Sequence, residues 1–157
     1  MKKIWISLVG FLAIASLSAQ EKPLPSLYGT GVWDADSLGN HRVVVSVDKA
    51  GDAVLATMNW RRRDLNPEEK NLIVVDAKTG KRVTNVARFT VNREKGEVVF
   101  QPQTVPGNYY IYYLKNVSSG SKYYPTVTYP AFEETADAEW LKANKLNGKR
   151  APKLPQA

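Results

Sequence analysis

The chain has 157 residues, a net charge of +7 and no cysteine, which excludes disulfide bonds, thiolate metal sites and lipid attachment at a cysteine. Six of its 22 Lys and Arg residues lie outside 20–144, two near the start and four in 145–157, so residues 20–144 hold 16 basic and 15 acidic side chains. A nearly neutral body with basic ends argues against a nucleic-acid-binding surface.

The first residues have the layout of a secretory signal peptide. Lys2 and Lys3 precede an apolar run over 4–17, and small residues follow as far as Ala19. The run is shorter than the ~20 residues that cross a bilayer, which disfavours a retained membrane anchor. We therefore expect removal of residues 1–19, a mature chain that starts at Gln20 and is secreted or periplasmic, and no membrane partner after cleavage.

Residues 20–32 contain prolines and predict an irregular lead, whereas residues 33–132 alternate short β-type segments with turns and show no helical periodicity. Glycine-containing turns separate the segments, including a hairpin turn at 49–52, and 71–76 is apolar on both faces, as in a central strand. The predicted strands, with their inward side chains, are 41–48 (Val43, Val45, Val47), 53–60 (Val54, Met58, Trp60), 71–76, 86–91 (Ala87, Phe89, Val91), 97–101 (Val98, Phe100), 109–114 and 123–129.

About seven short strands at this spacing predict one all-β domain over 33–132, an antiparallel β-sandwich that is immunoglobulin-like in broad shape. Residues 133–144 predict a short helix with Thr135 as N-cap and Trp140 as its anchor on the sandwich. Residues 145–157 hold two prolines, four basic residues and few apolar ones. That composition predicts a disordered basic tail or a truncated linker.

Chemistry-bearing residues are sparse, and the sequence predicts no catalytic residue, no metal site and no cofactor. His41 is the only histidine, so it has no second histidine or cysteine with which to build a zinc site, and we expect a structural role. Asp34 and Asp36 predict a turn stabilised by their side chains rather than a calcium loop, because Leu38 stands where a ligand is needed. No pair of acidic residues stands out as the two carboxyl groups that glycoside hydrolysis needs.

One segment is a candidate contact site for a glycan or a neighbouring domain. Trp60, Arg61, Arg62 and Arg63 follow one another at the end of a predicted strand, at one rim of the sandwich. Arginine binds acidic or hydroxylated groups with forked hydrogen bonds, and aromatic faces, including those of the tyrosines at 109–129, stack on sugar rings. In the alternative interpretation the tyrosines serve the core and the arginines pair with the nearby acids Asp64, Glu68 and Glu69.

Four short motifs in order carry a resemblance to a known family: 38–45 (LGNHRVVV), 60–64 (WRRRD), 76–81 (DAKTGK) and 109–114 (YYIYYL). They resemble the N-terminal β-sandwich region of large secreted glycoside-hydrolase-like proteins of the Bacteroides group, which are similar to glycoside hydrolase family 123. The likeness covers roughly residues 33–129. It implies a sandwich that precedes a larger catalytic domain, commonly a barrel, which carries the carboxylates. No catalytic residue carries over to this chain.

The leading hypothesis is therefore a non-catalytic module of a secreted glycosidase, whose partner is a catalytic domain outside this chain. A free-standing carbohydrate-binding module is a second hypothesis, and a secreted scaffold with only protein partners is a third. Exposed aromatic residues favour the second, and an uncovered apolar patch favours the first or the third.

Overall fold

The computed structural model describes residues 31–64 and 66–157, so the expected signal peptide and nearly all of the expected lead lie outside the described residues. No described helix is long and apolar enough to cross a membrane. The elements, in chain order, are α1 (Ala35–Leu38), β1 (Arg42–Val47), β2 (Val54–Asn59), the 3₁₀ turn η1 (Pro67–Glu69), β3 (Leu72–Asp76), β4 (Val86–Val91), β5 (Lys95–Phe100), β6 (Gly107–Tyr113), β7 (Val117–Gly120), β8 (Pro125–Thr128) and α2 (Ala138–Ala143).

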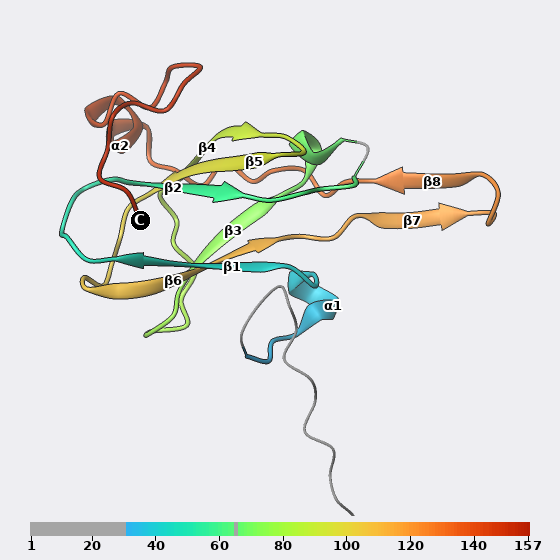
Figure 1. Ribbon diagram of the computed structural model, residues 1–157. Helices are drawn as coiled ribbons and strands as arrows, with labels where there is room; N and C mark the ends of the chain where they lie inside the picture. Colours follow the sequence, from blue (N-terminus) through green and yellow to red (C-terminus); the bar gives the residue numbers. More distant parts are fainter. Residues whose placement is uncertain (1–30, 65) are drawn as a thin grey trace, which may run out of the picture.

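Two antiparallel three-stranded sheets face each other, one in the order β1-β6-β3 and the other in the order β2-β5-β4, and a separate ribbon pairs β7 with β8 (Figure 1). The predicted all-β sandwich is confirmed. Consecutive strands β1 and β2 belong to different sheets, so 49–52 is a crossover and the predicted hairpin there is wrong. The predicted central place of β3 is also wrong: this strand lies at a sheet edge, where the backbone of Val74 and Asp76 bonds to the segment 81–83 instead of another strand.

The core lies between the two sheets and has the inward faces that strand alternation predicts for β1, β2 and β5. Val45 and Val47 from β1 pack in one cluster with Val54 and Met58 from β2 and with Phe100 from β5. Burying one such side chain contributes about 1.5–3 kcal/mol. The two sheets are therefore held together by a continuous aliphatic and aromatic layer.

Strand β4 departs from simple alternation because its pairing with β5 shifts register between Arg88 and Val91. Val86 and Val91 both face the inter-sheet core. Ala87 and Phe89, predicted to point inward, instead pack in the second cluster on the outer side of the sheet. A β-bulge changes which residues share a face, and the regular alternation assumed from the sequence could not show it.

The outer face of the β2-β5-β4 sheet is covered by α2 and by the residues that follow it (Figure 1). Trp140 is buried there and its indole N–H donates to the carbonyl of Asp52 at 2.9 Å. The predicted helix and its anchor are confirmed, but the N-cap is Asp137, whose carboxylate accepts from the backbone N–H groups of Glu139 and Trp140. The predicted cap, Thr135, donates its hydroxyl to the carbonyl of Thr84 instead.

Residues 145–157 are ordered, so the predicted disordered tail is wrong. Leu146 is 5% exposed, and Leu154 packs against the same outer cluster as Trp140. The backbone N–H of Leu55 donates to the carbonyl of Pro155 at 2.9 Å, and the N–H of Ala157 donates to the carbonyl of Leu55 at 3.0 Å. Few apolar residues suffice here because the segment pairs with the edge of β2 in parallel.

The segment 115–129 also differs from expectation. A glycine-containing turn was predicted between the strands 109–114 and 123–129, and 123–129 was predicted to join the sandwich, whereas β7 and β8 pair only with each other. Their ribbon projects away from the sandwich (Figure 1). Strand propensity predicted β structure in this segment correctly but not its partner, because pairing is decided by tertiary context.

Candidate functional site

An open cleft of about 1020 Å³ borders the Arg run and the strands β1 and β2. These two strands are edges of different sheets, so the cleft opens along the seam between the sheets. Its wall combines core-facing apolar side chains with the basic segment that follows β2. The lining residues are His41, Arg42, Val43, Met58, Asn59, Trp60, Arg61, Arg62, Arg63, Asp64, Leu72, Ile111 and Tyr113.

The segment 60–64 continues β2 in extended form. The backbone N–H groups of Trp60 and Arg62 donate to the carbonyls of Glu94 and Arg93, each at 2.9 Å. Donors two residues apart on one side of the chain are what a strand provides. Burial alternates accordingly, since Trp60, Arg62 and Asp64 are partly buried while Arg61 and Arg63 are exposed.

Trp60 is fixed by three neighbours. Its indole N–H donates to the carbonyl of Asn92 at 2.7 Å, and its ring meets that of Tyr113 edge-on with centroids 5.1 Å apart. It also packs over Gly96, where an added Cβ would lie only 2.4 Å from the indole. Trp60 was predicted to contact a ligand or a domain, and these contacts give it a structural role as a wall of the cleft.

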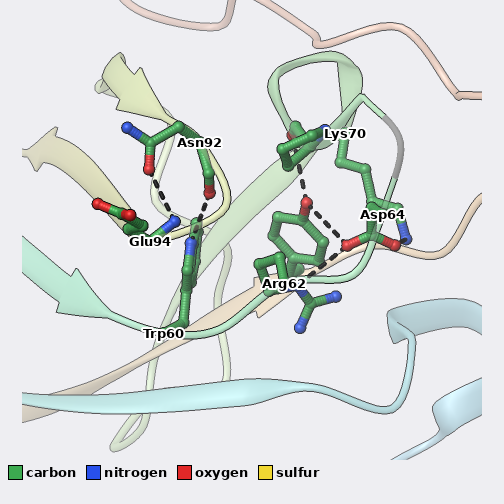
Figure 2. A network of polar contacts seen from close by, with 8 residues as sticks. Trp60, Arg62, Asp64, Lys70, Asn92 and Glu94 are labelled. Atoms are coloured by element: carbon green, nitrogen blue, oxygen red, sulfur yellow. Dashed lines mark hydrogen bonds and ion pairs between the residues drawn. The ribbon is translucent and has the colours of Figure 1, made fainter.

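Arg62, Asp64 and Lys70 form a partly buried ionic cluster (Figure 2). Both cations lie close to the Tyr113 ring. The Asp64 carboxylate receives the Arg62 Nε at 3.1 Å and the Lys70 Nζ at 3.2 Å. The Arg62 guanidinium lies 3.9 Å from the centre of the Tyr113 ring, and the Tyr113 hydroxyl donates to the carbonyl of Pro67 at 3.2 Å. The side chains of Arg62 and Lys70 are only 10% and 6% exposed, so solvent screens this cluster weakly.

Acid–base properties of the cluster follow from this geometry. Burial raises the pKa of Asp64, but the hydrogen bond from Lys70 and the charge of Arg62 outweigh burial and hold that pKa below its usual value. Burial and the Asp64 charge raise the pKa of the Tyr113 hydroxyl well above its usual value. At neutral pH the cluster therefore holds an ionised carboxylate between two cations and a protonated phenol.

Arg61 and Arg63 differ from Arg62. Within the described part of the chain neither has a hydrogen bond or an ion pair, and both border the cleft. The predicted pairing of the Arg run with nearby acids therefore holds for Arg62 alone. Sequence reasoning grouped the three arginines and missed Lys70 and Tyr113, although alternation from Tyr109 places Tyr113 on the inner face of β6.

The remaining charged residues of the cleft are held by other contacts. Arg42 is 7% exposed, and its guanidinium is stacked 4.3 Å from the Trp33 ring centre and 4.2 Å from that of Tyr110. Burial and the charge of Arg62 lower the pKa of His41, so this imidazole is neutral at pH 7. In residues 31–64 and 66–157 no group of three or more His, Cys, Asp or Glu side chains could hold a metal ion.

Near α1, the predicted turn at Asp34 is a short helix that this residue caps. Its carboxylate accepts from the Asp36 N–H at 3.0 Å and from the Ser37 hydroxyl at 2.6 Å. The Asp34 side chain therefore satisfies a free backbone N–H at the start of the helix, which is the stabilising role predicted for it.

Comparison with known proteins places these features in a family. The model of the glycoside hydrolase 123 N-terminal domain matches residues 31–157, which include the sandwich, α2 and the ordered tail. Searches of curated proteins and of solved structures gave no match. The predicted resemblance to the N-terminal region of family 123 is thereby confirmed, and the chain belongs to the glycoside hydrolase 123 N-terminal domain family.

Proposed function

We propose that this chain is the non-catalytic N-terminal module of a secreted glycoside hydrolase and that it packs against the catalytic domain through the β7–β8 ribbon. The observation that carries the proposal is the ribbon itself, whose strands are exposed along nearly their whole length. An isolated two-stranded ribbon is at best marginally stable in water, so a partner surface would complete it.

The carboxyl groups support a non-catalytic role. A glycosidase needs a general acid whose pKa is raised. Hydrogen bonds from Ser37 and from Lys95 lower the pKa of Asp34 and of Glu97, respectively. At Asp76 burial raises the pKa, but the Thr104 hydroxyl and two backbone N–H groups outweigh it and the pKa is lowered. With Asp64, these are the described carboxyl groups whose pKa departs clearly from its usual value, and each departs in the direction that disfavours a general acid.

The composition of the ribbon suits a protein surface as its partner. Tyr123 and Tyr124 at its tip are each 85% exposed, and serine and glycine make up most of β7. Tyrosine gives a large contact area at a low cost in side-chain entropy, and serine and glycine adapt to the partner surface. Residues 115–129 contain no acidic side chain, so a partner meets no negative charge on the ribbon.

The chain belongs to a family of N-terminal domains of glycoside hydrolases. This membership supports the proposal that its partner is the catalytic domain of such a hydrolase. Export is supported by the charged start, the apolar run and the small residues before Gln20. A secreted hydrolase of glycans would meet its substrates outside the cell.

The test uses the full chain and a purified catalytic domain of a family-123 hydrolase. Isothermal titration calorimetry is expected to show binding, and a Tyr123→Ser/Tyr124→Ser variant is expected to bind at least tenfold more weakly. Val32→Ser is the matched control, because Val32 is an apolar residue outside the ribbon that is 96% exposed. The chain alone is expected to leave a panel of aryl glycosides unhydrolysed. Turnover by the chain, or binding that the tyrosine variant retains in full, would refute the proposal.

A further inference from the structure

We propose that the cleft between β1 and β2 binds a carboxylated sugar, and that Arg61 and Arg63 hold its acidic groups. This site is separate from the β7–β8 ribbon and does not depend on the docking proposed above. It rests on the charge of the cleft, on its apolar wall and on its size.

The charge of the cleft is unbalanced. Among the described residues that line it, four are arginines and one is a carboxylate. Asp64 is already engaged by Arg62 and by Lys70, and Arg42 is stacked between two aromatic rings. The two arginines left over are Arg61 and Arg63, which are exposed and have no acidic partner in the described part of the chain. Residues 20–144 hold almost equal numbers of acids and bases, so this excess is local.

The backbone presents these two arginines as a pair. The extended segment 60–64 is anchored by the hydrogen bonds of Trp60 and Arg62, which leave Arg61 and Arg63 as the exposed members of the alternation. Residues two apart on a strand are about 6.7 Å apart, a spacing that lets two guanidinium groups act on one acidic sugar or on two neighbouring units. Guanidinium groups bind carboxylates by paired hydrogen bonds.

The wall of the cleft favours a sugar over an acidic peptide. Val43 contributes apolar surface and Trp60 contributes an aromatic ring, and both side chains are partly exposed. A hexuronate has apolar ring faces as well as a carboxylate, so it uses both parts of the wall, whereas a run of glutamate side chains uses only the arginines. The volume of about 1020 Å³ matches a small-ligand site rather than a protein interface.

The experiment measures binding of tetragalacturonate to the full chain by calorimetry at low salt. Its methyl ester is the neutral reference, and hexaglutamate is the acidic peptide reference. We expect tetragalacturonate to bind at least tenfold more tightly than either reference. An Arg61→Gln/Arg63→Gln variant is expected to lose at least tenfold in affinity for it at an unchanged melting temperature, and Arg150→Gln, an exposed arginine in the tail, is expected to bind as the parent does.

Three outcomes would overturn the proposal. The parent chain could fail to bind tetragalacturonate, which removes the site. Hexaglutamate could bind as tightly, which makes the surface a general anion site or a contact for an acidic protein. The double variant could bind as the parent does, which shows that Arg61 and Arg63 do not hold the ligand.

Discussion

Replacing Asp64 by asparagine tests whether the ionic cluster stabilises the rim of the cleft. The substitution removes the counter-charge from Lys70 and Arg62, which lie 3.2 Å and 3.1 Å away with side chains that are 6% and 10% exposed. Breaking a buried ion pair costs about 3–5 kcal/mol, because the remaining charge stays buried. Asp64 keeps 19% exposure and both cations keep their contact with the Tyr113 ring, so we expect a loss of about 2–3 kcal/mol.

Urea unfolding at pH 7 measures this loss as a lower midpoint with an unchanged slope. The effect also has a pH signature. The pKa of Asp64 is lowered in the folded state, so its stabilisation is present above its unfolded pKa of about 3.9 and is lost as the pH falls through the folded value. The gap between parent and Asp64→Asn is therefore expected to close in acid. Asp36→Asn is the control, because the Asp36 side chain is fully exposed, and equal stability of Asp64→Asn and the parent at pH 7 would refute the reasoning.

Three further predictions follow from packing and from the N-terminal sequence. Deleting residues 145–157 should lower the free energy of unfolding by several kcal/mol, since it removes the buried Leu146 and the backbone bonds to Leu55; an unchanged melting temperature would contradict the ordered tail. Gly96→Ala should cost about 1–3 kcal/mol and shift the fluorescence of Trp60, because the new methyl group meets the indole; an unaltered spectrum and stability would speak against this packing. Protein exported by its host should begin near Gln20 on N-terminal sequencing, and recovery of Lys2 would exclude cleavage there.

The sequence was sufficient for the parts of the fold that local periodicity controls. Val45 and Val47 in β1, and Val54 and Met58 in β2, face the core as their alternation predicts. The separation of β1 and β2 into different sheets was not predictable in this way, because the crossover at 49–52 has the same glycine-containing turn composition as a hairpin.

The tail shows a second limit of composition. Residues 145–157 look like a disordered segment when only their prolines and charges are counted. Leu146 and Leu154 are enough to hold it, because the outer face of the neighbouring sheet already supplies Leu55 and Val99 as partners. Burial of a short segment depends on what lies opposite it, and that information is not local.

The run of three arginines after Trp60 marked the candidate site in the sequence, but it did not show that their surroundings differ. Strand alternation continues through 60–64, so Arg62 is partly buried while Arg61 and Arg63 are exposed. The role of each residue in 60–64 depends on whether its side chain faces Tyr113 and Lys70. Those contacts join parts of the chain that are far apart in sequence. Trp60 and Arg62 are held by contacts within the protein, whereas Arg61 and Arg63 are exposed and available to a ligand.

The register shift in β4 affects how this domain can change in evolution. Val86 and Val91 pack in the inter-sheet core, and Ala87 and Phe89 pack in the outer cluster. The register shift between Arg88 and Val91 decides which residues of the strand face each cluster. The irregularity inserts one extra residue between Arg88 and Val91, so removing it would restore regular pairing with β5 and leave Val91 on the core face, whereas adding another residue there would turn Val91 to the outer face. We therefore expect homologous domains to vary freely in length at the tip of the β7–β8 ribbon, and to shorten β4 at this irregularity more readily than they lengthen it.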